Sequence, residues 1–231
     1  MDAAAAGWHG KLPTLGDFAT RRLDASFVEP WDAWLSEGIA TLRTQEKWLD
    51  AYLASPSWRF LLMPGVIGET AWVGVLMPSV DRVGRYYPLT LAHPLAALPR
   101  RADDVDTVWT WLLRIDEAAV DALQEDWDID ALEAELRRIG VPPLAAAAPS
   151  RATASLHAVP LQGHRHAAAA IAAQAAALGI DSLRGQAWWY AESGLESPVL
   201  LRSAGLDRGR LAARLFGTVG DNPATQLDAP R

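Results

Sequence analysis

Residues 69–79, with the sequence ETAWVGVLMPS, form an almost uninterrupted apolar run. A half-exposed strand would alternate apolar and polar residues, but the segment from Ala71 to Met77 contains no polar residue. Continuous runs of this length are typical of a central strand that is covered on both faces. The chain must therefore supply helices or loops to pack on each side of this strand.

A second apolar stretch, YYPLTLAHPL (residues 86–95), follows after the short polar loop VDRVGR. The simplest interpretation of the two stretches is a β-hairpin or a strand–loop–strand corner. Further strands are predicted where apolar residues alternate or cluster between turn signals, in residues 7–13, 57–65, 152–161, 186–193 and 197–205.

Apolar residues at helical spacing predict helices between these strands. The helix that begins at Ser26 is predicted to have a capping box, with Ser26 as the N-cap and Glu29 three residues later. Asp128 is predicted to cap another helix, which stops before Gly140. The predicted helices cover residues 26–44 and 46–55, two related segments from Asp103 to Leu123, and residues 128–139, 164–179 and 206–217. Helices and strands alternate irregularly, so we expect an α/β fold with a mixed sheet between helical layers.

The 231 residues are enough for one large domain or two small ones. The stretch VPPLAAAAPS (141–150) reads as a linker between a larger part, 1–140, and a smaller part, 151–217. We expect both parts to belong to a single α/β domain, 1–217, followed by a disordered tail, 218–231.

Composition excludes several classes of function. The net charge of −7 argues against nucleic acid and anionic membrane surfaces as partners, because both need a basic footprint. The chain has no cysteine, which rules out disulfides and thiol catalysis. No apolar run approaches the length of about 20 residues that spans a bilayer, and the N-terminus does not resemble a signal peptide. We therefore expect a cytoplasmic protein without stable membrane insertion; its oligomeric state is not predicted.

Common catalytic and cofactor motifs are absent from the sequence. The segment GKLPTLGD places Gly-Lys first and has no Ser or Thr after the lysine, so it is not a phosphate-binding loop. His164 and His166 are two residues apart and would point to different faces of a helix. The sequence predicts no metal site and no cofactor.

Several charged residues stand near predicted strand ends or turns, where function often lies. They are Lys11, Asp17, Asp81, Arg82, Arg85 and His93. In a functional interpretation, Asp17 or Asp81 is a base and Arg85 holds an anion. In a structural one, Asp81 caps the hairpin loop and Arg85 pairs with a carboxylate such as Asp17. We favour the structural interpretation, since no nucleophile or second acid lies at a spacing that is typical of a catalytic site.

Most of the eleven tryptophans fit the apolar faces of predicted elements. Trp188 and Trp189 are adjacent on a predicted strand and must point to opposite faces of the sheet. If one of the two is exposed, it is a candidate anchor for a binding partner.

Four segments occur in an order that resembles the type VI secretion-associated TagF/ImpM family. They are GKLPTLGDF (10–18), FVEPWDAWL (27–35), SPSWRFLLMPG (55–65) and GVLMPSVDRVGRYYPLTLA (74–92). The resemblance is dense from about residue 7 to residue 93 and looser up to Gly140 and in the C-terminal hairpin. It implies a three-layer α/β/α sandwich, in agreement with the sheet inferred above.

The resemblance also implies a non-catalytic, cytoplasmic accessory protein of the bacterial type VI secretion system. Proteins of this family act as post-translational negative regulators of apparatus assembly and firing, and they are linked to an FHA-domain scaffold protein. On this basis Lys11, Asp17, Asp81, Arg82 and Arg85 are expected to cluster at one end of the sheet, as a structural ion-pair network or as a docking patch.

An enzyme that acts on a phosphorylated or nucleotide ligand through Lys11, Asp17, Asp81 and Arg85 is the alternative. An enclosed pocket with unpaired carboxylates would favour the enzyme, and a shallow surface with paired charges would favour a binding protein.

Overall fold

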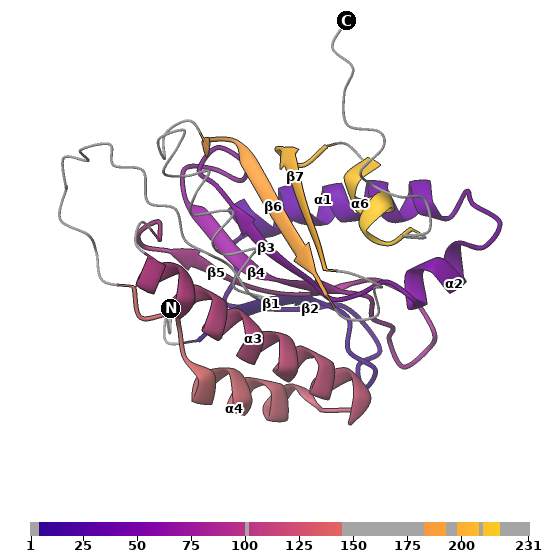
Figure 1. The fold of residues 1–231 in the computed structure, drawn as a ribbon. Helices are drawn as coiled ribbons and strands as arrows, with labels where there is room; N and C mark the ends of the chain where they lie inside the picture. The colour runs from indigo at the N-terminus through magenta and orange to yellow at the C-terminus, as the bar shows by residue number, and fades with distance from the viewer. Residues whose placement is uncertain (1–4, 100–101, 145–182, 193–197, 208–209, 218–231) are drawn as a thin grey trace, which may run out of the picture.

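The computed structural model describes residues 5–99, 102–144, 183–192, 198–207 and 210–217 (Figure 1). Residues 145–150 of the predicted linker, the predicted strand at 152–161, the predicted helix at 164–179 and the predicted tail lie outside these residues.

A seven-stranded sheet forms the middle of the molecule. Its strand order is β2-β1-β5-β4-β3-β6-β7, and every ladder between these strands is antiparallel. The strands are β1 (Gly7–Gly10), β2 (Ala19–Arg21), β3 (Trp58–Leu62), β4 (Ala71–Met77), β5 (Leu89–Leu95), β6 (Gln186–Ala191) and β7 (Val199–Ala204). The sequence predicted a mixed sheet. An apolar run shows that a strand is covered on both faces, but it does not encode the direction of the neighbouring strands.

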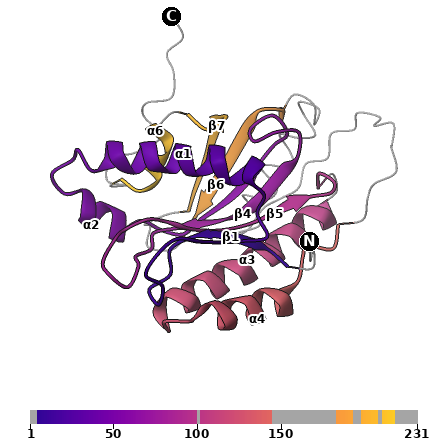
Figure 2. The same ribbon diagram turned by 180° about the vertical axis from the view of Figure 1, so that it is seen from behind.

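Helices cover both faces of this sheet (Figures 1 and 2). On one face lie α1 (Ala25–Leu42), α2 (Trp48–Leu53) and α6 (Arg210–Leu215), and on the other lie α3 (Ala102–Gln124) and α4 (Ile129–Ile139). The expected three-layer α/β/α sandwich is therefore confirmed.

The central strand β4 separates two hydrophobic cores. All seven of its residues are buried. Val73 and Val75 belong to the core beneath α3 and α4, while Trp72 and Leu76 belong to the core beneath α1. This alternation follows from the period of two along a strand, and it explains why the run carries no polar residue.

Two helix predictions need correction. The N-cap of α1 is Asp24 rather than Ser26, and it makes no side-chain capping hydrogen bond, so the predicted capping box does not form. The two segments predicted between Asp103 and Leu123 are one helix, α3, because no glycine or proline interrupts them. The Asp128 cap is confirmed, since its side chain accepts a hydrogen bond from the Ala131 N–H.

Trp188 and Trp189 point to opposite faces of β6, as predicted, but neither is exposed. Trp188 lies in the core beneath α3, and Trp189 lies in the core beneath α1. The idea of an exposed tryptophan anchor in this pair is therefore wrong.

None of the described helices combines the length and the apolar character needed to span a bilayer.

Candidate functional site

The β4–β5 hairpin places the charged residues of its loop at one end of the sheet. Strand β4 ends at Met77 and β5 begins at Leu89, and an isolated bridge between Val80 and Tyr86 narrows the connecting loop. On the other side of β5, β1 runs antiparallel with His9 opposite Thr90. Lys11, two residues further, therefore leaves the sheet beside the hairpin loop.

Close approach of the backbones at Gly10 makes this arrangement possible. Gly10 has a φ of +134°, and a Cβ atom added there would lie 2.2 Å from the carbonyl oxygen of Pro88. Only glycine fits so close to the neighbouring strand. Lys11 is thereby held against the base of the hairpin loop.

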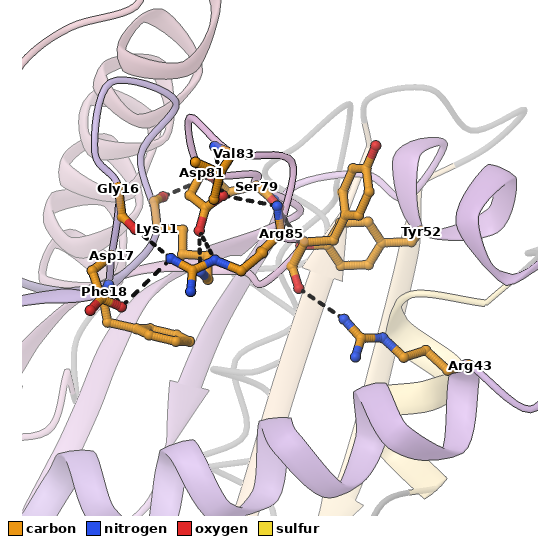
Figure 3. A network of polar contacts seen from close by, with 11 residues as sticks. Lys11, Gly16, Asp17, Phe18, Arg43, Tyr52, Ser79, Asp81, Val83 and Arg85 are labelled. Carbon is orange, nitrogen blue, oxygen red and sulfur yellow. Dashed lines mark hydrogen bonds and ion pairs between the residues drawn. The ribbon is translucent and has the colours of Figure 1, made fainter.

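Asp81 is the centre of the cluster, and both of its carboxylate oxygens are fully engaged (Figure 3). Oδ1 accepts hydrogen bonds from the backbone N–H groups of Val83 (3.0 Å) and Arg85 (2.9 Å). Oδ2 accepts from Lys11 Nζ at 2.5 Å and from Arg85 Nε at 2.7 Å. The carboxylate thus closes the loop and joins it to the N-terminal segment.

The Lys11–Asp81 ion pair is buried. The exposed fractions of the two side chains are 3% and 0%. Burial alone raises the pKa of the Asp81 carboxyl, but the hydrogen bonds from Lys11, Arg85 and Val83 outweigh it and hold that pKa well below its usual range. Asp81 therefore remains a carboxylate at neutral pH, with its acceptor positions taken by protein donors.

Tyr52 supports the base of the cluster from the α1 side of the sheet (Figure 3). Its hydroxyl donates to the carbonyl of Ser79 at 2.9 Å and accepts from the Ser79 N–H at 2.8 Å. The Ser79 hydroxyl in turn donates to the carbonyl of Lys11 at 2.7 Å. These bonds fix the backbone on both sides of the buried ion pair.

Arg85 connects the buried pair to the surface. Its side chain is 54% exposed, donates to the carbonyl of Gly16, and lies 3.9 Å from the carboxylate of Asp17. The main partner of Arg85 is therefore Asp81, and Asp17 is only a distant one. Asp17 instead accepts a hydrogen bond from the N–H of Phe18 at 2.8 Å.

Arg82 joins the cluster through its backbone, because its N–H donates to the carbonyl of Leu15 at 2.9 Å. Its exposed guanidinium makes no ion pair with any described residue. The structure therefore brings together four of the five predicted side chains and leaves the fifth, Arg82, facing solvent.

Two large apolar side chains are exposed beside these charges. Phe18 is 46% exposed and Val83 is 64% exposed. The Phe18 ring lies over Lys11 Nζ at 4.4 Å and packs edge-on against Tyr87 at 4.7 Å. We call the group Asp17, Phe18, Arg82, Val83 and Arg85 the tip surface.

Sequence reasoning missed Phe18 and Val83, although both lie within the quoted motifs. Their positions next to a turn were the available signal, because an apolar residue in a tight loop has little core to enter.

Sequence reasoning also missed a buried network on the α4 side. There Glu133 accepts from Trp8 Nε1 at 2.7 Å and pairs with Arg22 and Arg137. Trp8 and Glu133 are 125 residues apart, so no local pattern indicates their contact.

The geometry offers little for catalysis at the cluster. Asp81 has no free acceptor position, and its lysine partner is buried. No group of three or more metal-ligating side chains occurs in the part of the chain that the structure describes. Fold and site together define an α/β/α sandwich that carries a rigid hairpin end with exposed charged and apolar residues.

Comparison with known proteins identifies the family to which this sandwich belongs. The sequence matches the family described as TagF N-terminal domain, type VI secretion system-associated, over residues 7–139. The chain belongs to this family, as its motifs predicted. It is also similar to PA0076 from Pseudomonas aeruginosa PAO1, whose crystal structure superposes with a TM-score of 0.71 at 32% sequence identity. The match covers 92% of this chain and 94% of that one. No curated protein sequence matches the chain.

Proposed function

We propose that this protein is a cytoplasmic negative regulator of type VI secretion that acts after translation by binding an FHA-domain scaffold protein through its tip surface. Membership of the TagF family makes it a type VI secretion-associated protein. Repression, the FHA-domain partner and the docking surface are proposals that go beyond membership of this family. We also propose that residues 1–217 act as a single domain.

The observation that carries the proposal is the division of the cluster into a buried base and an exposed rim. At the base, Lys11 and Asp81 form a buried ion pair, and Asp81 also accepts two hydrogen bonds from the backbone of its loop, as a structural carboxylate does. At the rim, Phe18 and Val83 expose apolar surface next to Arg82 and Arg85. Exposed apolar side chains beside arginine are a combination that is enriched at protein interfaces.

The charges at the rim indicate the chemistry of the partner surface. The whole chain has a net charge of −7, yet the tip surface carries two arginines against one aspartate. A complementary partner surface would be acidic with an apolar pocket, and its association rate would fall as salt screens the charges. We propose an interface of standard size, about 1,600 Å² in total.

The arrangement disfavours the alternative enzyme. A catalytic carboxylate needs a free lone pair directed at a substrate, and Asp81 has none. The Asp17 side chain is 82% exposed, and it accepts a hydrogen bond from the backbone N–H of Phe18.

A secretion assay in the native bacterium tests the proposal. Overproduction of the wild-type chain should reduce type VI secretion, and the double variant Arg82→Glu/Val83→Ser should lose this effect at equal protein level. Lys47→Met, a change at an exposed lysine outside the tip surface, is the matched control and should repress like the wild type. Repression by the double variant would overturn the docking surface, and no repression by the wild type would overturn the regulatory role.

A further inference from the structure

A side chain of α2 holds the backbone at the base of the hairpin loop. Ser79 lies two residues beyond the end of β4, and its N–H donates to the Tyr52 hydroxyl at 2.8 Å. The same hydroxyl donates to the Ser79 carbonyl at 2.9 Å, and this carbonyl also accepts from the Tyr87 N–H at 3.1 Å. One phenol thus binds both backbone groups of Ser79 at a point where the ladder between β4 and β5 has already ended.

Tyr52 also contacts the returning arm of the hairpin loop. Its ring packs edge-on against the ring of Tyr86 at 6.0 Å, and Tyr86 directly follows Arg85 in the chain. Figure 3 shows Tyr52 on one side of the loop and Lys11 on the other. The loop that carries the tip surface is therefore held from two sides, by the buried ion pair on one and by Tyr52 on the other.

The C-terminal end of the described chain packs against Tyr52. Tyr52 and Phe216 are both 0% exposed, and their ring centroids are 5.3 Å apart. The Leu215 carbonyl accepts hydrogen bonds from Ser55 Oγ and Trp58 Nε1, each at 2.9 Å. Since these two donors lie in the connection from α2 to β3, their bonds fix the residue before Phe216 relative to α2.

Helix α6, which ends just before Phe216, is closely packed on α1. A Cβ atom added to Gly38 of α1 would lie 2.2 Å from the Cβ atom of Ala212, so only glycine permits this approach. Ahead of α6, the carbonyl of Asp207 accepts a hydrogen bond from Trp34 Nε1 at 3.0 Å. The docking of α6 on α1 therefore determines where Phe216 lies.

We propose that α6 and Phe216 position the tip surface through Tyr52, so that the hairpin loop keeps its ordered form only while α6 is docked. The contacts run from Phe216 through Tyr52 to Ser79. The Ser79 hydroxyl then donates to the Lys11 carbonyl at 2.7 Å, beside the buried ion pair. Helix α6 lies outside residues 7–139, the part that matches the family, and yet it supports the loop within that part. The importance of this support for partner binding rests on the proposed function.

Hydrogen exchange of the loop amides tests this positioning. The N–H groups of Val83 and Arg85 donate to Asp81 Oδ1, so their exchange rates in ¹H–¹⁵N spectra report local opening of the loop. Tyr52→Phe removes only the hydroxyl and should accelerate both amides by about tenfold, the factor for one lost hydrogen bond. Phe216→Leu should accelerate them by about fivefold, the factor for one lost aromatic pair.

A matched variant separates positioning from a general loss of stability. Phe27 is also 0% exposed and lies in the same core beneath α1, but it packs on tryptophan rings rather than on Tyr52. Phe27→Leu should lower the urea midpoint as Phe216→Leu does, because both remove buried aromatic surface, but it should leave the two loop amides at the wild-type rate.

The exchange rates decide the proposal in the free protein. Loop amides that keep the wild-type rate in Tyr52→Phe and Phe216→Leu, or that exchange equally fast in Phe27→Leu, would overturn the positioning role of α6. A wild-type chain that binds no FHA-domain partner would instead overturn the proposed function, and the exchange rates would still decide the positioning.

Discussion

Lys11→Met removes the buried ammonium group while keeping a side chain of similar length. In the native protein Lys11 Nζ lies 2.5 Å from Asp81 Oδ2, and neither side chain is accessible to solvent to any useful degree. The variant leaves a buried carboxylate with three donors in place of four, namely Arg85 Nε and two backbone N–H groups. Its fold should persist, but with lower stability.

The magnitude follows from the environment of the pair. Removal of one partner from a buried ion pair costs about 3–5 kcal/mol. Because Arg85 remains 2.7 Å from the same carboxylate oxygen, we expect the lower end, about 3 kcal/mol. For a chain of this size that corresponds to a fall in Tm of about 6–12 °C. The loss of the contact between Lys11 and the Phe18 ring acts in the same direction.

Urea unfolding followed by far-ultraviolet circular dichroism measures the effect. The midpoint should fall with an unchanged m value, since the same surface is exposed on unfolding. Lys47→Met is the matched control, because Lys47 is the only other lysine and is exposed, and it should change stability by less than about 0.5 kcal/mol. A loss below about 1 kcal/mol in Lys11→Met would show that the ion pair contributes no more than an exposed one, contrary to this expectation.

Four further predictions concern single regions of the molecule. Burial lowers the pKa of His93 from 6.5 to about 4. Between these pH values the unfolded chain binds a proton that the native protein does not, so stability should fall as the pH drops from 6.5 to 4. His93→Gln should flatten this part of a plot of the urea midpoint against pH. Asp81→Asn should flatten the profile below pH 4, because the native carboxyl has a depressed pKa and its contribution is lost only as pH falls. Glu133→Gln should lose about 2–3 kcal/mol in the same assay, since charge-assisted hydrogen bonds at a buried group are weakened. Arg82→Glu/Val83→Ser should keep the wild-type Tm within about 2 °C, as expected for exposed positions, and a larger loss would show that the tip surface is structural.

Much of the fold was accessible from the sequence, because burial leaves a direct record in apolar patterning. The unbroken run at Ala71–Met77 indicated a strand covered on both sides, and the structure has helices on both faces. Strand direction was not accessible, since a doubly covered strand has the same pattern in parallel and antiparallel sheets. The Asp24 cap was missed because Ser26 and Glu29 have the residue types and the spacing of a capping box, although the helix begins earlier.

Local contacts of the candidate site could be predicted from the sequence, and long-range contacts could not. Placement of charged residues beside turns indicated that Asp81 closes its own loop, since such bonds are local in sequence. The contact of Lys11 with Asp81 crosses 70 residues and depends on the β1–β5 pairing, which no local pattern specifies. Motif resemblance suggested that the two segments meet, but it carried no information about which cation binds Asp81 and which faces solvent.

The proposed interaction with an FHA-domain protein is best measured by isothermal titration of the purified chain with the FHA-domain protein encoded in the same genome. We expect binding with micromolar or tighter affinity that weakens at high salt, and a loss of binding heat in Arg82→Glu/Val83→Ser. The same titration with Lys47→Met should match the wild type. No binding heat, with both proteins folded, would show that the chain does not act by binding this partner.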